Sequence, residues 1–146
     1  MIERKLATKE DSIAFAYEIA PLLKKGDILA LYGKLGAGKT FFTQYLCKKL
    51  GVNEYVNSPS YVLMNEYLSG DFPIFHLDLY RIKSEEEVLE LGLYEIFDSG
   101  ITIIEWPEIG EDFLPEKTIS LKFFYDGDGR RVEVYGLDSF KVKMGI

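Results

Sequence analysis

The stretch LYGKLGAGKTFF, residues 31–42, joins a short apolar segment to residues with helical spacing. Ile28–Tyr32 lies between two glycines and predicts a buried strand, and the residues from Lys39 onward predict a helix. The residues between them fit the pattern G-x-x-x-x-G-K-S/T, in which backbone N–H groups point into one concavity. Glycine is needed where a side chain would block a phosphate. The stretch therefore predicts a phosphate-binding loop.

Each part of this loop has an expected chemical role. The helix N-terminus supplies a partial positive charge, and the Lys39 ammonium supplies a full charge for the outer phosphates. The Thr40 hydroxyl is the expected Mg²⁺ ligand. The residues expected to bind the nucleotide here are Gly33, Lys34, Leu35, Gly36, Ala37, Gly38, Lys39, Thr40 and Phe41.

The composition is that of one folded domain. The chain has 146 residues, 47% hydrophobic and 28% charged, so we expect a single domain over residues 1–146. No apolar run reaches the roughly 20 residues that a membrane helix needs, and the N-terminal residues lack the apolar core of a signal peptide. The single cysteine, Cys47, cannot form an internal disulfide. These features predict a cytoplasmic protein with Cys47 packed in its interior.

The charge balance argues against direct binding of nucleic acid. The chain carries 17 Lys and Arg residues against 24 Asp and Glu residues, a net charge of −7. Affinity for nucleic acid comes largely from Lys and Arg side chains that neutralise phosphates. We therefore expect no direct contact with DNA and none with a membrane. An acidic protein can still work beside nucleic acid through a basic partner.

The other segments predict an α/β domain. Strands are expected at residues 2–7, 61–68, 72–80, 101–105, 118–125 and 130–136, and helices at residues 12–25 and 84–92. Pro21 should kink or shorten the first helix, and Ser84 with Glu87 predicts a capping box for the second. The strands at residues 61–68 and 72–80 are expected to form one hairpin, and those at residues 118–125 and 130–136 a second. This order predicts a P-loop NTPase-like three-layer domain whose mixed sheet has a parallel centre and antiparallel additions.

Two acidic residues are candidates for the rest of the site. Nucleotide turnover needs a carboxylate near the metal and a group that positions water. Glu105 ends the continuously apolar strand ITIIE, whereas Asp78 shares one face of the alternating segment IFHLDLY with His76 and Tyr80. We assign Glu105 to Mg²⁺, directly or through water, and Asp78 to a water-orienting or phosphate-sensing role. With Lys39 they are the candidate catalytic residues. A solvated acid at a strand end is the alternative for Glu105.

The only histidine cannot belong to a zinc site, because the chain has one cysteine and no second histidine. We expect His76 to form a structural hydrogen bond to the neighbouring loop. The segment NSPSY, residues 57–61, places Ser58 and Ser60 where nucleotide hydrolases often sense the third phosphate, although an ordinary turn is the alternative. Trp106 is expected to pack in the interior or to anchor a partner at the lip of the site.

Four motifs, GKLGAGKT, SPSY, HLDLYR and IEWPE, resemble in order and spacing those of the TsaE family, also called YjeE. This family consists of small P-loop ATPases of bacterial tRNA threonylcarbamoyladenosine synthesis. The resemblance extends over nearly the whole chain, up to Gly129 and Arg130. It implies an ATPase that uses ATP and Mg²⁺ and acts on a TsaB–TsaD protein pair. TsaD transfers threonylcarbamoyl to the adenosine beside the anticodon, so tRNA is implied only through the partners.

The resemblance also implies roles for individual residues. By matching positions, Lys39 and Thr40 would bind phosphate and magnesium, and Glu105 would bind the metal. Asp78 and Trp106 would be required for activity. Ser58 and Ser60 would belong to a mobile switch loop, and Gly129 and Arg130 would approach the nucleotide. Lys34 stands where the family usually has aspartate, which changes the charge beside the phosphates. Ser60 stands where threonine is usual and keeps the hydroxyl.

Three other functions are compatible with a phosphate-binding loop. A small-molecule P-loop kinase needs an acceptor pocket and a lid, for which this chain has little length or arginine to spare. A GTPase needs an N-K-x-D stretch to recognise guanine, and the chain has none, so adenine is expected. A nucleotide-dependent clamp would use residues 57–61 as an order–disorder switch, and docking rather than hydrolysis would be its function.

Overall fold

The sheet is built around the strand that leads into the phosphate-binding loop. In the computed structural model, which describes residues 1–136, seven strands form one sheet in the order β1-β7-β6-β2-β5-β4-β3. β2 (Ile28–Tyr32) lies at its centre and pairs in parallel with β5 (Ile101–Glu105) and β6 (Ile119–Asp126). The domain predicted over residues 1–146 extends beyond the described residues at its C-terminal end.

The remaining strands complete the mixed sheet. β4 (Ile74–Asp78) is parallel to β5, and β3 (Met64–Tyr67) is antiparallel to β4. β7 (Gly129–Tyr135) is antiparallel to β6, and β1 (Ile2–Leu6) is antiparallel to β7. This arrangement confirms the predicted parallel centre with antiparallel additions, including both hairpins. All five residues of β4 are buried, as are those of β5. The predicted contrast between an alternating and a fully buried strand was therefore wrong, because helices cover both faces of the sheet.

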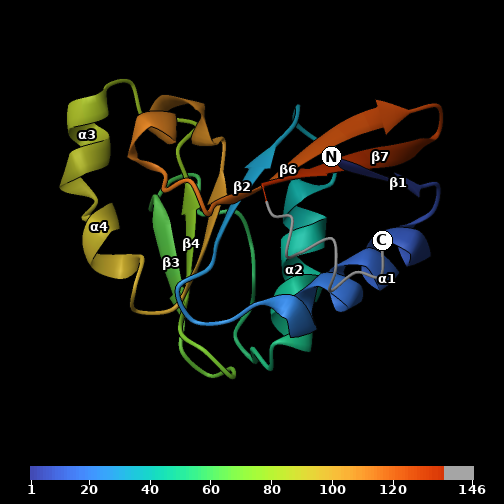
Figure 1. Ribbon diagram of the computed structural model, residues 1–146, viewed down its shortest axis with the longest axis horizontal. Helices are drawn as coiled ribbons and strands as arrows, with labels where there is room; N and C mark the ends of the chain where they lie inside the picture. The colour runs from blue at the N-terminus through green and yellow to red at the C-terminus, as the bar shows by residue number, and fades with distance from the viewer. Residues whose placement is uncertain (137–146) are drawn as a thin grey trace.

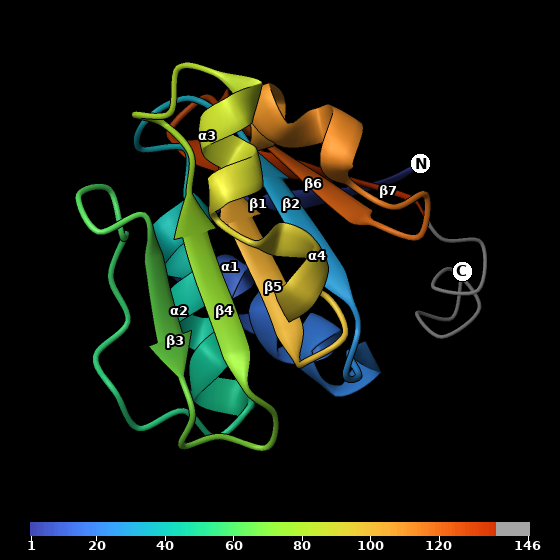
Figure 2. The ribbon, with the colours of Figure 1, turned by 90° about the vertical axis from the view of Figure 1, so that its left-hand side faces the viewer.

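Helices cover the sheet on both faces (Figure 1). α1 (Lys9–Ile19) and α2 (Lys39–Lys49) lie on one face, and α3 (Glu85–Glu90) and α4 (Leu93–Ile96) lie on the other, as Figure 2 shows from the side of α3 and α4. One apolar cluster lies beneath α1 and α2, and a second lies beneath α3, α4 and the 3₁₀ segment η2 (Pro107–Phe113). The three-layer prediction is confirmed.

The first helix begins earlier than predicted. The Thr8 hydroxyl accepts a hydrogen bond from the Asp11 backbone N–H at 3.2 Å, and the Asp11 carboxylate accepts one from the Thr8 N–H at 3.2 Å. This reciprocal cap starts α1 at Lys9 rather than at residue 12. The helix ends at Ile19 and passes into a short 3₁₀ turn, Ala20–Leu22, which contains Pro21. The predicted shortening by proline is thus confirmed.

The cap of α3 is only half of the predicted capping box. The Ser84 hydroxyl accepts from the Glu87 N–H at 3.3 Å, but the Glu87 carboxylate accepts from Lys83 N–H at 3.1 Å and not from Ser84. Gly92 follows this helix with φ 71°. α4 and η2 were not predicted, because each is too short for a helical period to show in the sequence. Cys47 is buried as predicted, and burial raises the pKa of its thiol to about 12.

Candidate nucleotide-binding site

The loop between β2 and α2 depends on glycine at its turns. Gly33, Gly36 and Gly38 have φ values of 145°, 80° and 111°, which side chains rarely adopt. A Cβ at Gly33 would lie 2.8 Å from the Phe123 carbonyl oxygen, and a Cβ at Gly36 would lie 2.6 Å from the Tyr125 hydroxyl. Both neighbours belong to β6. The loop is therefore shaped by its own glycines and held against the β6–β7 hairpin.

The hairpin also donates hydrogen bonds to the outside of the loop. Arg130 Nε and Nη2 donate to the Gly36 carbonyl at 3.2 and 3.1 Å, and the Tyr125 hydroxyl donates to the Leu35 carbonyl at 2.5 Å. The Arg130 guanidinium stacks on the Tyr125 ring at 4.4 Å from its centroid. Gly129 lets this hairpin approach β1, because a Cβ there would lie 2.8 Å from backbone atoms of Ala7. The structure thus places Arg130 against the predicted loop and Gly129 beside Ala7, next to the end of β1.

Lys39 begins α2 and is almost completely buried, with 5% of its surface exposed. Its ammonium donates to the Gly33 carbonyl across the loop. Burial lowers the pKa of Lys39, and the carboxylates of Glu105, Glu108 and Asp78 oppose that shift. The first N–H groups of a helix have no partner within it. The ammonium and these amides together form a cationic end of α2 suited to an anion.

Trp106 covers this ammonium. The Lys39 Nζ atom lies 3.5 Å from the centroid of an indole ring, and the Tyr80 ring packs 4.8 Å from the indole. The backbone of Trp106 is left-handed, with φ 53° and ψ 57°, a conformation that costs a residue other than glycine about 1–3 kcal/mol. This turn directly after Glu105 ends β5 and directs the indole over the loop. Trp106 therefore belongs to the site rather than to the interior.

Glu105 contacts the start of α2. Its Oε1 atom accepts a hydrogen bond from the Thr40 hydroxyl at 3.0 Å, and its Oε2 atom pairs with His76 Nε2 at 2.6 Å. The predicted bond between His76 and a loop was wrong, since the histidine instead links strand β5 to Tyr67 of β3. Glu105 is 2% exposed, so the solvated strand end does not describe it.

The Thr40 and Glu105 oxygens suit a hard cation that arrives with phosphates. Among residues 1–136 no group of three or more His, Cys, Asp or Glu side chains could hold a metal by itself. Mg²⁺ in nucleotide sites takes one or two carboxylates, waters and phosphate oxygens rather than an all-protein cage. The donor set at Thr40 and Glu105 therefore fits Mg²⁺ bound together with a nucleotide.

Asp78 holds the serine-containing loop. Its Oδ2 atom accepts hydrogen bonds from the hydroxyls of Ser58 at 2.7 Å and Ser60 at 3.0 Å. Its Oδ1 atom accepts from the Tyr80 backbone N–H at 2.9 Å. The carboxylate thus fixes both serines beside the end of β4, where strand pairing places it opposite Glu105. The structure therefore brings Ser58 and Ser60 to the same edge of the sheet as the phosphate loop.

Two cavities flank the phosphate loop. The first, of about 470 Å³, is lined by Leu35, Gly36, Gly38, Lys39, Thr40, Phe41, Ser58, Ser60, Tyr61, Asp78, Tyr80, Arg81, Glu105 and Trp106. The second, of about 280 Å³, is lined by Leu6, Ala7, Thr8, Lys9, Ser12, Gly36, Gly38, Phe41, Asp128, Gly129 and Arg130. Because Gly36, Gly38 and Phe41 line both, the cavities meet at the loop.

Three of the predicted loop residues, Gly33, Lys34 and Ala37, line neither cavity. Lys34 is exposed, and the side chain of Ala37 is buried beneath the loop. The Ala37 N–H donates to the Lys34 carbonyl at 3.0 Å, so this amide is directed into the loop itself. These three residues shape the loop, and the other predicted residues of the stretch line one or both cavities.

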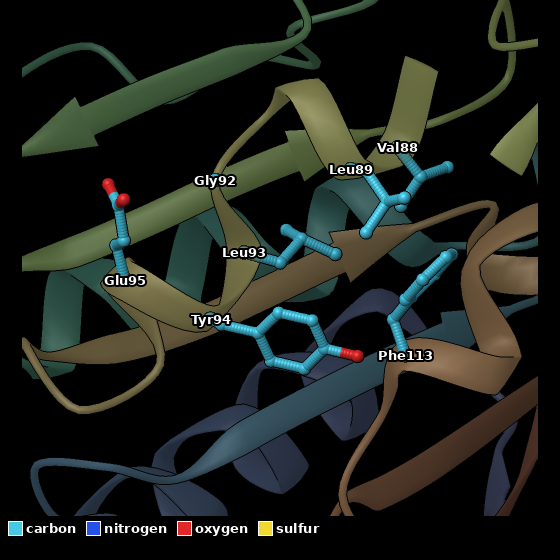
Figure 3. A pocket seen from close by; sticks show the side chains of 7 residues that line it. All are labelled: Val88, Leu89, Gly92, Leu93, Tyr94, Glu95 and Phe113. Carbon is cyan, nitrogen blue, oxygen red and sulfur yellow. The ribbon is translucent and has the colours of Figure 1, made fainter. Parts of the chain in front are cut away.

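A separate small cavity of about 140 Å³ lies between α3, α4 and η2, on the far side of the sheet (Figure 3). Its lining residues are Val88, Leu89, Gly92, Leu93, Tyr94, Glu95 and Phe113. The Tyr94 and Phe113 rings meet edge to face at 6.2 Å. The lining is mostly apolar and includes no cationic side chain, so a phosphate is not expected to bind there.

Comparison with known proteins agrees with this geometry. Residues 6–132 match the family described as threonylcarbamoyl adenosine biosynthesis protein TsaE. The chain belongs to the TsaE family. It is 39% identical over 123 residues to the tRNA threonylcarbamoyladenosine biosynthesis protein TsaE of Bacillus subtilis, covering 84% of this chain and 77% of that protein. For the TsaE protein of Rickettsia bellii, identity is 40% over 128 residues, 87% of this chain and 89% of that protein.

A solved structure extends the likeness to the fold. The crystal structure of Bacillus subtilis YdiB superposes with a TM-score of 0.81 at 28% sequence identity, covering 99% of this chain and 91% of that one. The TsaE resemblance of the sequence motifs is thereby confirmed. The matched residues 6–132 include the phosphate loop, both strand-end acids and Arg130.

Proposed function

We propose that this member of the TsaE family binds ATP with Mg²⁺ and hydrolyses it during tRNA threonylcarbamoyladenosine synthesis, acting on a TsaB–TsaD pair in the cytoplasm. One observation carries the proposal. Lys39, Thr40 and Glu105 converge at the start of α2, beside a glycine loop with a cavity on either side. A buried ammonium, a hydroxyl and a carboxylate in that order are the groups that a nucleoside triphosphate and its cation require.

The phosphates fit the side of the loop that faces Lys39. On binding, the ammonium exchanges its bond to the Gly33 carbonyl for oxygens of the outer phosphates. The free N–H groups at the start of α2 add hydrogen bonds of the same polarity. Arg130 and Tyr125 hold the opposite side of the loop through its carbonyls, which keeps the concavity open.

Thr40 and Glu105 are the residues that would hold Mg²⁺, since their oxygens already lie 3.0 Å apart at the start of α2. When bound, the cation would supply positive charge that stabilises the phosphate oxygens during hydrolysis. Trp106 excludes water above Lys39 and stacks on its ammonium. Electrostatic interactions are stronger where water is excluded.

The adenine ring fits the second cavity. This space lies between the start of α1 and the β6–β7 hairpin, where Thr8 and Ser12 provide hydroxyl groups and Phe41 an aromatic face. A nucleotide whose base lies there can run its phosphates past Gly36 and Gly38 into the first cavity. No N-K-x-D stretch is present to recognise guanine, which favours ATP over GTP.

Asp78 best fits the role of a sensor of the third phosphate. Its Oδ2 atom accepts from Ser58 and Ser60, so the carboxylate is coupled directly to the serine-containing segment. A third phosphate that attracts these hydroxyls would break the contacts and free the carboxylate. The same exchange would move residues 57–61, which also supports a nucleotide-dependent clamp as a second candidate function.

Exposed aromatic and apolar side chains surround the mouth of the first cavity. Leu35, Tyr61 and Tyr80 all line it and are all exposed. Exposed apolar groups gathered around a site are typical of protein–protein contacts. We therefore place the TsaB–TsaD contact at this mouth, with tRNA held by the partners because this chain is acidic.

The direct test is phosphate release from ATP by the purified protein, alone and with TsaB and TsaD. We expect Mg²⁺-dependent release that a Lys39→Ala variant loses, and calorimetric binding of ATP but not of GTP. Release that requires an added metabolite would favour the kinase instead. For the clamp, Glu105→Ala should lose turnover while ATP still promotes co-purification with the partners, and docking that ignores nucleotide would exclude it.

A further inference from the structure

A chain of buried hydrogen bonds runs behind Glu105, on the side away from Thr40. Tyr67 Oη lies 3.0 Å from His76 Nδ1, and His76 Nε2 lies 2.6 Å from Glu105 Oε2. Strands β3, β4 and β5 supply the three residues in turn. His76 is fully buried and Tyr67 is 2% exposed. A buried polar network of this kind is specific because every member needs its partner.

The chemistry of the groups fixes the direction of this chain. An ionised carboxylate only accepts hydrogen bonds, so His76 Nε2 carries the proton that faces Glu105. In the neutral imidazole, Nδ1 then accepts from the Tyr67 hydroxyl. Tyr67 in turn accepts from Asn65 Nδ2 at 3.4 Å, and the same amide donates to the Asn57 carbonyl at 3.3 Å. The chain thus reaches the start of the segment that contains Ser58 and Ser60.

We propose that His76 is a positioning residue that holds Glu105 for the cation, and that Tyr67 fixes the tautomer of His76. The inference rests on the proposed function, since it concerns the same Mg²⁺. His76 engages Oε2 and so leaves Oε1, which already contacts Thr40, directed at the start of α2. Partners behind a metal ligand orient it and raise its affinity for the metal. The Tyr67 hydroxyl keeps the Nε2 proton where Glu105 needs it.

The test measures Mg²⁺ binding rather than turnover. Trp106 is the only tryptophan and lines the cavity, so its fluorescence reports on the site. Mg²⁺ is titrated into protein saturated with a non-hydrolysable ATP analogue, and thermal unfolding checks that each variant is folded. The paired variants are His76→Gln, whose amide can replace Nε2 as the donor to Glu105, and His76→Asn, whose shorter side chain cannot.

We expect His76→Asn to raise the half-saturating Mg²⁺ concentration about tenfold or more, as the loss of such a partner does elsewhere. His76→Gln should stay within about threefold of the wild type on the same grounds. Tyr67→Phe, a milder change, should fall between them. Thr102→Val is the matched control, because Thr102 is a buried polar residue of the same strand as Glu105 and its hydroxyl has no hydrogen-bond partner among residues 1–136. It should leave the Mg²⁺ curve unchanged.

Two results would overturn the inference. If His76→Asn and His76→Gln require equal Mg²⁺, or if folded His76→Asn matches the wild type, His76 does not position Glu105. In that case the proposed function still holds, provided that the fluorescence of the wild-type protein changes with Mg²⁺. A wild-type protein whose fluorescence ignores Mg²⁺ would instead overturn the proposed cation site and this inference together.

Discussion

Asp78 and Glu105 lie directly opposite each other at the ends of neighbouring parallel strands, and each is 2% exposed. Their partners nevertheless differ completely. Asp78 accepts from Ser58 and Ser60, whereas Glu105 is bonded to Thr40 and His76. At this edge of the sheet, the carboxylate that contacts the start of α2 therefore lies beside the carboxylate that contacts residues 57–61, the predicted switch segment. In the function proposed above, both carboxylates lie beside the nucleotide and its cation.

Removing the Thr40 hydroxyl should weaken the cation site without removing the phosphate loop. Thr40→Ala deletes the oxygen that lies 3.0 Å from Glu105 Oε1, so the cation loses one ligand. We expect phosphate release to fall about 100-fold at fixed Mg²⁺, in the range that removing one electrostatic contact costs, with partial recovery at high Mg²⁺. The measurement is the rate of phosphate release against Mg²⁺ concentration.

Thr40→Ser is the matched control, because it keeps the hydroxyl and removes only a methyl group. It should retain most of the activity at every Mg²⁺ concentration. Equal losses in the two variants would mean that packing of the Thr40 methyl group, and not the hydroxyl, supports the site.

Gly36 should tolerate no side chain. A Cβ there would lie 2.6 Å from the Tyr125 hydroxyl, and the φ of 80° is strained for any other residue. Gly36→Ala should therefore lower the free energy of unfolding by about 1–2 kcal/mol or more and weaken ATP binding. Gly127→Ala isolates the strain, since Gly127 has φ 59° and its Cβ would meet nothing within 4 Å.

The measurements are chemical denaturation and calorimetric titration with ATP. Gly127→Ala should lose stability but keep its affinity for ATP. If Gly36→Ala binds ATP as tightly as Gly127→Ala does, the shape of the loop does not depend on the contact with Tyr125.

The sequence was most informative where a local pattern determines geometry. The glycine spacing of residues 33–40 predicts a loop between a strand and a helix, and the structure has that loop between β2 and α2. Glu105 was placed correctly at the end of its strand, whereas Asp78 was predicted inside a strand over residues 72–80 that in the structure ends at Asp78. The two acids meet because parallel strands end at one edge of a sheet. The TsaE motifs then predicted the family.

Contacts between distant segments could not be predicted from such patterns. His76 was expected to bind a loop, but its partners come from β3 and β5, which only the assembled sheet brings near. Its position two residues before Asp78 was the available signal, since the two share a face of β4. Likewise, Tyr125 faces Leu35 across 90 positions of the chain, and no local period carries that information.

Lys39 should make stability depend on pH in the alkaline range. Burial lowers its pKa below the ordinary 10.5, so the unfolded chain binds the proton more tightly than the folded protein does. Stability therefore rises with pH between the lowered pKa and 10.5, as the folded state loses an unfavourable charge. Lys39→Met lacks this group, and its free energy of unfolding should rise less over that range.

The measurements are denaturation curves at several pH values for the wild type, Lys39→Met and Lys34→Met. Lys34→Met is the control, because Lys34 is exposed on the same loop. Its pH dependence should parallel that of the wild type. If Lys39→Met also parallels the wild type, burial of the ammonium does not disfavour its charge.

Releasing the serines from Asp78 should make the switch segment independent of nucleotide. Ser58 and Ser60 donate to the same Asp78 oxygen at 2.7 and 3.0 Å, and each can replace the other in part. Each single alanine variant should therefore change the ATP dependence of docking only slightly. The double variant Ser58→Ala/Ser60→Ala should change it by more than the two single effects added together. The double variant should dock on TsaB–TsaD equally with and without ATP, which co-purification measures.

Ser69→Ala, in a loop outside both cavities, serves as the control. A double variant that still requires ATP for docking would show that Asp78 does not sense the third phosphate through these serines.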